Sequence, residues 1–282
     1  PPEWSLSRYD FRNVEDPVTS AIEWMRADMD HPADPEREPL FTHALLRVAE
    51  DRYLWFQRYH HIALDAYGFS LITRRVARLY AGADPQRPWS LAALTAADAD
   101  YRDSPDLEAD RGYWLARYAD RPEPVRLSRG TGPVRRRSIE LAPDQLAALR
   151  DVAREQGTSV SRVFVAALAA YAHLLTGATE VVLGIPVTAR DSRTRELPGM
   201  VSNVLPLRIA VRPEMSTGEL VRETTVQLRK LLDHGRYRGE WLARELGAAG
   251  GIRELVGPSI NIMSFEHVEF DGLRTETRKL SA

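Results

Sequence analysis

The spacing of apolar residues predicts helices and strands that alternate along the whole chain. Residues 19–30 place Ile22, Met25 and Met29 at helical intervals, which is typical of an amphipathic helix. Segment 53–59 is rich in aromatic residues on both faces, which indicates a strand covered on two sides. The same reasoning predicts further helices after Gly68, over 107–118, over 143–156, from Thr158 or Ser159 to near Gly177 and over 216–234, and further strands over 41–49, 134–141, 180–187, 201–211 and 258–265.

This alternation predicts an α/β protein with mixed sheets flanked by helices. The composition changes after residue 118, where Arg, Pro, Ser, Thr and Gly dominate, so this stretch is the best candidate for a linker. We therefore expect an N-terminal lobe over 1–118, a linker over 119–133 and a C-terminal lobe over 134–282.

Composition and charge exclude several classes of function. The 282 residues include 38 Lys and Arg against 40 Asp and Glu, so no basic excess exists to neutralise a nucleic acid. The chain has no Cys, which removes disulfides, thiolate metal sites and Cys nucleophiles and fits a reducing cytoplasm. No signal-peptide pattern is visible, and the longest uncharged run, 163–179, is slightly short for a membrane span. We expect a cytoplasmic protein with neither nucleic acid nor membrane as a partner.

The motif richest in chemical groups is His60-His61, followed by Asp65, directly after the strand 53–59. Strand periodicity sends the two imidazoles to opposite faces, so that one lies inside the fold and the other opens on a cleft. A histidine at a strand end with a carboxylate in the next turn suits general-base catalysis. The structural alternative is a core histidine, a surface histidine and an aspartate that caps a helix. No third ligand accompanies His61 and Asp65, so we expect no metal.

Five segments, in order, resemble the signatures of condensation domains of nonribosomal peptide synthetases, which are relatives of chloramphenicol acetyltransferase. Segment 60–66 is similar to His-His-x-x-x-Asp-Gly. The other segments are YRD at 101–103 with YW at 113–114, GIPVTAR at 184–190, GMVSNVLPLR at 199–208 and HGRYRGE at 234–240. The resemblance covers nearly the whole chain. It implies two chloramphenicol-acetyltransferase-like lobes in a V-shaped pseudo-dimer.

The resemblance implies an acyltransferase that forms amide bonds. The α-amine of an aminoacyl thioester on one carrier protein attacks an acyl or peptidyl thioester on another. Donor and acceptor carrier proteins and neighbouring synthetase domains are the implied partners. The carriers supply phosphopantetheine arms, and the domain itself is expected to bind no cofactor. An α-amine has a pKa of about 7.7–8.0, so positioning the two tethered groups is a larger task than deprotonation.

The same resemblance points to individual residues of the His-His motif. His61 is the expected active imidazole, either as a base or by orienting the amine or stabilising the tetrahedral intermediate. His60 is expected to be structural, and Asp65 to shape the loop before Gly68. Ala66 stands where the signature has Gly, so its methyl group is either tolerated or narrows the channel where substrate and backbone approach.

Three further residues lie in the later motifs. Arg190 and Arg208 are the candidates for an ion pair with Asp65, and Arg208 is alternatively a solvated charge at a strand end. Asn203 corresponds to a family position near the cleft, where it contacts substrate or carrier arm or else turns the chain at a strand end.

Two other functions fit the motif. An epimerisation domain of the same superfamily has a similar signature, although segment 66–70 differs from the Gly-Val-Ser-Trp type expected there. A catalytically impaired scaffold that only docks carrier proteins is the other alternative, and Ala66 is the residue that motivates it.

Overall fold

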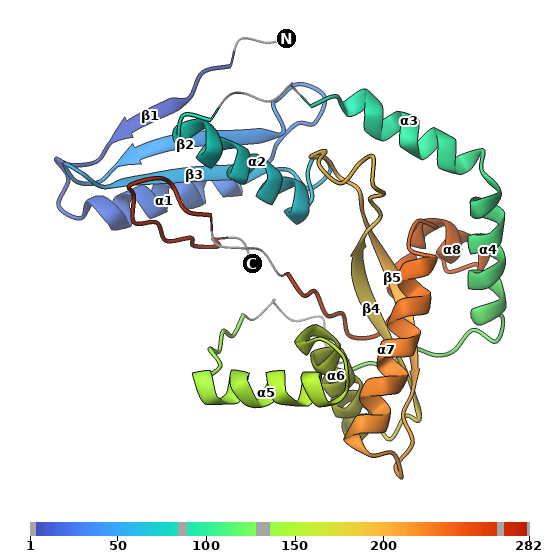
Figure 1. Cartoon of the computed structure of the whole chain (residues 1–282). Helices are drawn as coiled ribbons and strands as arrows, with labels where there is room; N and C mark the ends of the chain where they lie inside the picture. The colour runs from blue at the N-terminus through green and yellow to red at the C-terminus, as the bar shows by residue number, and fades with distance from the viewer. Residues whose placement is uncertain (1–3, 84–88, 128–135, 264–267, 281–282) are drawn as a thin grey trace. The chain divides into compact units, whose positions relative to one another are not determined.

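The computed structural model describes residues 4–83, 89–127, 136–263 and 268–280. The chain forms two compact units (Figure 1). The first comprises residues 1–89, 198–200 and 267–282, and the second comprises 90–197 and 201–266. The units therefore divide at residue 89, earlier than the linker that composition suggests. The described part of that linker packs inside the second unit, where Val125 is buried beside Tyr118.

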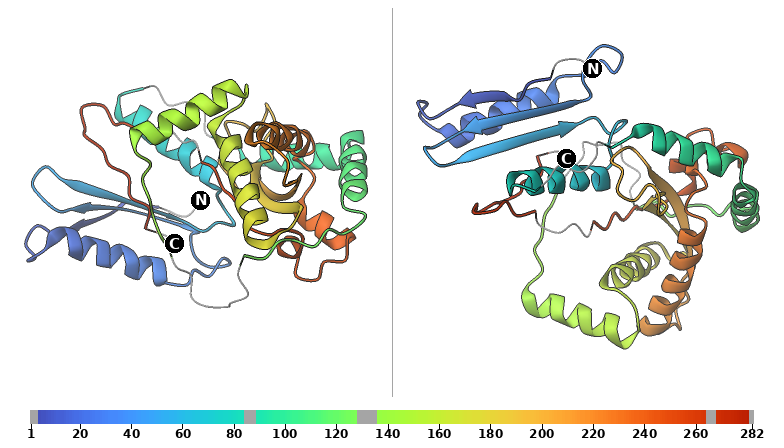
Figure 2. Two further views of the ribbon diagram at one scale, coloured as in Figure 1. Left: turned by 90° about the horizontal axis from the view of Figure 1, so that it is seen from below. Right: turned by 45° about the horizontal axis from the view of Figure 1, so that its top comes forward.

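The first unit is built on a mixed sheet of order β1-β2-β3. Strand β1 (Ser7–Asp10) runs parallel to β2 (Phe41–Arg47), which pairs antiparallel with β3 (Tyr53–Tyr59). Helix α1 (Pro17–Asp30) packs on one face of the sheet (Figure 2). Its N-terminus is capped by Asp16, whose carboxylate accepts from the Thr19 amide at 3.1 Å. Helix α2 (Ala66–Tyr80) follows β3.

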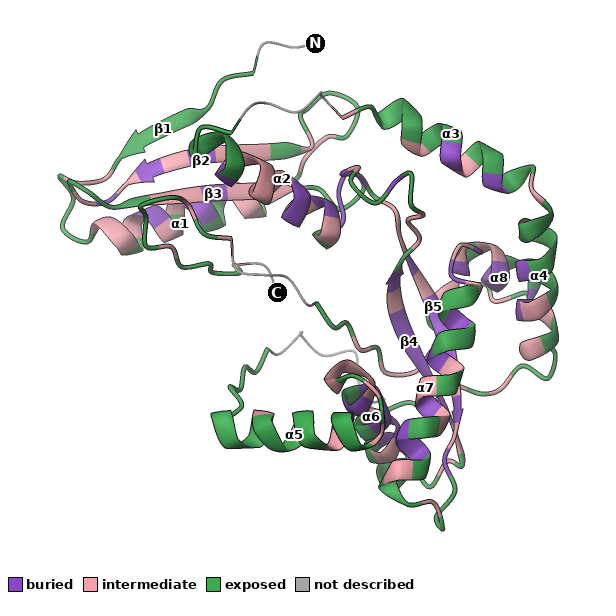
Figure 3. Cartoon of the chain, in the orientation of Figure 1, coloured by how far each residue is buried: buried purple, intermediate pink, exposed green. Residues whose placement is uncertain are grey.

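The second unit contains most of the helices and one antiparallel strand pair. Strand β4 (Glu180–Thr188) pairs with β5 (Ser202–Ala210) and is almost wholly buried, because both of its faces are apolar (Figure 3). The helices are α3 (Leu91–Arg102), α4 (Pro105–Arg117), α5 (Pro143–Glu155), α6 (Val160–Thr176), α7 (Thr217–Asp233), α8 (Gly239–Glu245) and α9 (Ile252–Leu255). Helix α6 ends at Gly177 in the left-handed conformation, with φ 72°, as its sequence predicts.

These elements confirm the α/β class, and most of the predicted helices and strands form with shifts of one to a few residues. Two predicted strands are wrong. Of the strand expected over 134–141, residues 134–135 lie outside the described residues and 136–141 have no regular structure. Ile139 is 87% exposed, so the apolar residues there have nothing to pack against. The strand expected over 258–265 reduces to a single parallel bridge between Ser259 and Gly184, and its residues 264–265 lie outside the described residues.

In the described part of the chain, no single helix is long and apolar enough to cross a membrane. Helices α5 and α6 reach that length and composition only as a pair bent by 96°.

Candidate active site

The His-His motif occupies the turn between β3 and α2. The strand ends at Tyr59, so the two histidines are not on a strand and their rings do not alternate between faces. Both histidines are exposed, which corrects the expectation that one of the two imidazoles lies inside the fold. The backbone N–H of His60 donates to the Leu40 carbonyl at 2.8 Å, and its ring Nδ1 accepts from the Ile62 amide at 3.1 Å. His60 therefore shapes the turn from the surface, and His61 presents an exposed imidazole.

Asp65 closes the turn and caps α2. It is 4% exposed, and its Oδ1 accepts from the Gly68 amide at 2.7 Å. Its own N–H donates to the Gly199 carbonyl at 3.3 Å. The carboxylate thus lies at the positive end of the helix dipole and satisfies one of the free N–H groups of the first turn. This geometry is compatible with the predicted loop-shaping role of Asp65, which stays a prediction.

The close backbone approach in this motif occurs at Gly68 rather than at residue 66. A Cβ on Gly68 would lie 2.6 Å from Leu64 Cδ1 and 3.0 Å from the Gly199 nitrogen, so a side chain does not fit there. Ala66 is exposed as the first residue of α2, where any residue adopts the helical backbone. The fold therefore accommodates Ala66 without strain in the backbone.

Arg208 is held by carboxylates of the second unit. Its guanidinium forms a bidentate pair with Asp120, at 2.7 and 2.6 Å, and donates to both oxygens of Glu180 at 2.6 and 2.7 Å. Its side chain is 12% exposed, so it is not a solvated strand-end charge. Hydrogen bonding to Asp120 and Glu180 raises the pKa of Arg208 further above its usual value. Arg208 is therefore a structural ion-pair residue whose partners are not Asp65.

Arg190 follows β4. It donates to the Leu197 carbonyl at 3.3 Å and to the Thr188 hydroxyl at 3.2 Å. It is the remaining candidate for an ion pair with Asp65, and that pair stays a prediction.

The Asn203 side chain links two parts of the fold through hydrogen bonds and is not a substrate contact. It is 3% exposed, and its amide nitrogen donates to the carbonyls of Gly235 and Tyr237 at 3.0 and 2.7 Å. Its Oδ1 accepts from the Gly239 amide at 2.9 Å. The amide therefore joins β5 to the loop before α8, which leaves no donor for a substrate or a carrier arm.

Two other family-like segments meet in one buried network. Asp110, which the sequence did not single out, accepts from the Tyr101 hydroxyl at 2.6 Å and pairs with His234 Nδ1 at 2.7 Å. The His234 ring stacks on Tyr113 with centroids 3.9 Å apart, and Trp114 donates to the His234 carbonyl. Burial and the Asp110 hydrogen bond raise the pKa of Tyr101. These contacts bind α3, α4 and the end of α7 together, and they explain the spacing of those motifs structurally.

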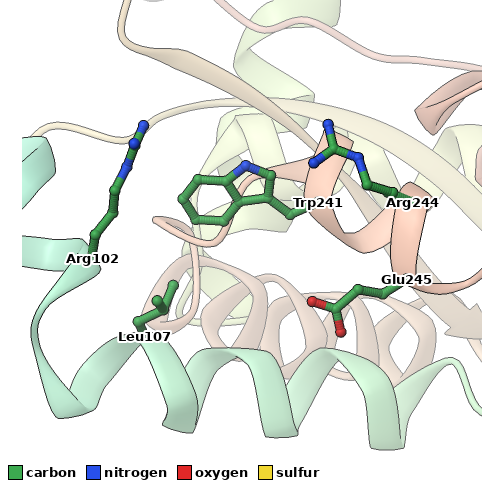
Figure 4. A pocket seen from close by; sticks show the side chains of 5 residues that line it. All are labelled: Arg102, Leu107, Trp241, Arg244 and Glu245. Carbon is green, nitrogen blue, oxygen red and sulfur yellow. The ribbon is translucent and has the colours of Figure 1, made fainter.

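A pocket of about 380 Å³ lies elsewhere in the second unit, between α3, α4 and α8 (Figure 4). Its lining residues are Arg102, Leu107, Trp241, Arg244 and Glu245, none of which is a predicted site residue. Glu245 is engaged by Arg111 and by the Tyr237 hydroxyl, so it is not a free acid or base. The candidate site is therefore the His-His turn and not this pocket. Among the described residues, no group of three or more His, Asp or Glu could hold a metal ion.

Comparison with known proteins gives consistent matches along the chain. The family described as Condensation domain matches residues 3–281. A dimodular nonribosomal peptide synthase of Bacillus subtilis (strain 168) is 40% identical over 293 residues, which cover 100% of this chain and 12% of that protein. An isonitrile lipopeptide synthase of Streptomyces coeruleorubidus is 42% identical over 293 residues, which cover 99% of this chain and 20% of that protein.

Solved structures give the same fold. The starter condensation domain of rhizomide synthetase, in complex with C8-CoA and Leu-SNAC, matches with a TM-score of 0.83 and 36% identity, over 94% of this chain and 62% of that one. The first condensation domain of the CDA synthetase matches with a TM-score of 0.82 and 38% identity, over 96% and 62%. The chain thus spans less than two thirds of the solved domains and a fifth or less of these two curated relatives.

Proposed function

Because this chain belongs to the condensation-domain family of nonribosomal peptide synthetases, we propose that it forms amide bonds between two carrier-bound thioesters. The acceptor α-amine attacks the thioester carbon of the donor acyl or peptidyl group. The C–N bond forms, the C–S bond breaks, the donor arm leaves as a thiol, and the amine loses one proton.

The observation that carries this proposal is the exposed His61 imidazole, which precedes the buried Asp65 that caps α2. A neutral imidazole accepts a hydrogen bond from the attacking amine, orients its lone pair and takes its proton as the tetrahedral intermediate collapses. General acid–base catalysis of this kind contributes about 10²–10⁴-fold. Holding two tethered substrates in contact lowers the activation barrier by up to about 7–11 kcal/mol, so positioning contributes more to the rate than proton transfer does.

Carrier proteins are the proposed partners, and their phosphopantetheine arms are the substrates' tethers rather than cofactors of this chain. We further propose that Asp65 pairs with Arg190 and that the two units form the V-shaped pair of lobes typical of the family, with the reaction taking place in the cytoplasm.

The function is tested with the native full-length protein, a donor carrier loaded with an acyl group and an acceptor carrier loaded with an amino acid. Intact mass of the acceptor carrier should increase by the acyl group only when all three proteins are present. Deuterium incorporation at the α-carbon of a loaded amino acid, without amide product, would instead favour epimerisation. Carrier binding without turnover, with turnover restored by Ala66→Gly, would favour a docking scaffold. The absence of strain at Ala66 argues against that last outcome.

A further inference from the structure

The face of the first sheet opposite α1 carries a cluster of rings that the His-His motif does not account for. Trp4, Phe41, His43, Tyr59 and Phe69 form this cluster, which we call the aromatic wall. Neighbouring ring centroids lie 5.3–6.3 Å apart. Trp4 is 53% exposed and Phe41 38%, so the wall is open to solvent at its rim. None of its members carries a formal charge when His43 is neutral, which fits an uncharged occupant.

One polar chain runs through the wall, and its direction follows from the chemistry of its members. Trp55 Nε1 lies 3.2 Å from His43 Nδ1, and His43 Nε2 lies 2.6 Å from the Tyr59 hydroxyl. An indole N–H is only a donor, so Nδ1 is the acceptor and carries no proton. Burial lowers the pKa of His43, which favours the neutral ring. The remaining proton is then on Nε2, which donates to the Tyr59 oxygen.

This direction leaves the Tyr59 hydroxyl proton unused. Burial raises the pKa of Tyr59, so the phenol keeps its proton. His43 is the only hydrogen-bond partner of that hydroxyl within the described residues, and it occupies the oxygen as a donor. The half-buried Tyr59 therefore offers a directed O–H donor beside apolar rings, and a ligand that brings an acceptor would engage it.

The wall is continuous with the candidate active site. Tyr59 is the last residue of β3, and the turn that presents His61 begins at the next residue. Phe69, on the first turns of α2, packs edge-on against the Tyr59 ring at 5.8 Å. A ligand that lies against the aromatic wall therefore contacts β3 and α2, the two elements that flank the His-His motif.

We propose that the aromatic wall receives the acyl chain of a substrate and that the Tyr59 hydroxyl selects chains that carry an oxygen acceptor, such as a hydroxyl or keto group. His43 acts through Tyr59 as a positioning residue, because its Nε2–H fixes which way the phenol donates. The inference rests on the proposed function, since it assigns a substrate class to the same site.

The test compares matched acyl donors in the native full-length protein. One donor is a plain saturated acyl thioester, and the others are the same chain with one hydroxyl or keto oxygen at successive carbons. In the wild type, at least one oxygenated chain should react with a kcat/KM about tenfold above that of the plain chain, as expected for one hydrogen bond. Tyr59→Phe keeps the ring stacking and removes the donor, so it should reduce this ratio to about one.

The His43 role has its own matched pair of variants. Gln has an oxygen that accepts from Trp55 and an N–H₂ that donates to Tyr59, so His43→Gln should keep most of the selectivity. His43→Leu fills the space without either group and should lose most of it. Nitrogen NMR of the wild type should show the neutral Nε2–H tautomer of His43, a signature independent of activity.

The outcomes separate the two proposals. Absence of amide product with every donor would overturn the proposed function. Amide formation without preference for any oxygenated chain, or a preference that survives Tyr59→Phe, would overturn the role of Tyr59 alone. If Tyr59→Phe instead lowers the melting temperature and slows all donors equally, the wall is covered by polypeptide and the inference is wrong. An Nδ1–H tautomer would contradict the positioning role of His43.

Discussion

The Oδ1 atom of Asp65 accepts a hydrogen bond from the backbone N–H of Gly68 at 2.7 Å, which ties the carboxylate of the His-His motif to the first turn of α2. The helix therefore begins where the motif ends. Any change in this cap alters both the stability of α2 and the turn that presents His61.

Loss of the Asp65 cap should destabilise α2. Asp65→Ala removes the hydrogen-bond acceptor for the Gly68 amide, and the loss of an N-cap of this kind lowers the free energy of unfolding by about 1 kcal/mol. Asn is as good a cap as Asp, so Asp65→Asn should retain most of that stability. Hydrogen exchange at the amides of Gly68 and Phe69 measures the effect locally. Equal protection of those amides in the two variants would show that the cap is not what holds the helix start.

The close approach at Gly68 should make Gly68→Ala destabilising. The added methyl would meet Leu64 and the backbone of Gly199, and the backbone cannot move aside. We expect a loss of about 1–3 kcal/mol in the free energy of unfolding, as for other overpacked sites. Gly112→Ala in α4 is the matched control, because nothing lies within 4 Å of the Cβ position at that glycine. This variant should raise the free energy of unfolding by about 0.4–1 kcal/mol. A neutral Gly68→Ala in urea unfolding would contradict the close approach.

The Arg208 network should give a pH-dependent stability. The Arg208 hydrogen bond holds the pKa of Asp120 below its ordinary 3.8. A carboxyl with a lowered pKa stabilises the fold above its unfolded pKa, and this contribution is lost as the pH falls through the lowered value. Arg208→Leu should therefore destabilise the fold at neutral pH, and the difference from wild type should shrink in acid. Urea unfolding at several pH values measures it.

The control for this prediction is Arg154→Leu, which breaks an exposed pair with Asp151. Exposed ion pairs contribute about 0–1 kcal/mol, so its effect should be small at every pH. A cost of Arg208→Leu that stays constant from neutral pH into acid would mean that the Asp120 pair is not the source of the stability.

Substitutions of Asn203 test whether this residue has a structural role or contacts a substrate. Asn203→Ala leaves two carbonyls and one N–H without their buried partner, which should cost at least about 2 kcal/mol of unfolding free energy. Asn203→Asp keeps the acceptor for Gly239 but turns a buried carboxylate oxygen toward the carbonyls of Gly235 and Tyr237, so it should cost at least as much as the Ala variant. Melting temperatures of the wild type and the two variants give their order of stability. A variant with unchanged stability and a raised KM for a loaded carrier would restore the substrate role.

Sequence reasoning predicted elements wherever apolar periodicity was strong. Residues 216–234 were predicted as a helix and form α7 (Thr217–Asp233), because its apolar stripe and its Ser216 capping box agree. Strand β1 was missed because all four of its residues are exposed, so it has no buried face to create a pattern. Helix α3 was missed because only Ala97 and Tyr101 are buried on an Ala-rich helix.

The site was predicted less completely than the fold. The motif predicts His61 and Asp65 as site residues, and these roles stay predictions. The expected alternation of the two rings required β3 to continue through His60, whereas the strand ends one residue earlier. The network around Asn203 and the ion pairs of Arg208 depend on residues 28 to 88 positions away in the chain, and local spacing does not encode such contacts. The direction of the hydrogen bonds through His43 likewise required the positions of Trp55 and Tyr59.

The central claim concerns His61, and its most direct test is the rate of amide formation by His61→Ala beside His60→Ala. Both histidines are exposed in the same turn, and the His60 ring accepts from the Ile62 amide, so His60→Ala should disturb the turn at least as much as His61→Ala. With donor and acceptor carriers loaded, His61→Ala should slow product formation by about 10²-fold or more, and His60→Ala should stay within a few-fold of wild type. A His61→Ala protein that joins the two carrier-bound groups at the wild-type rate would contradict the account.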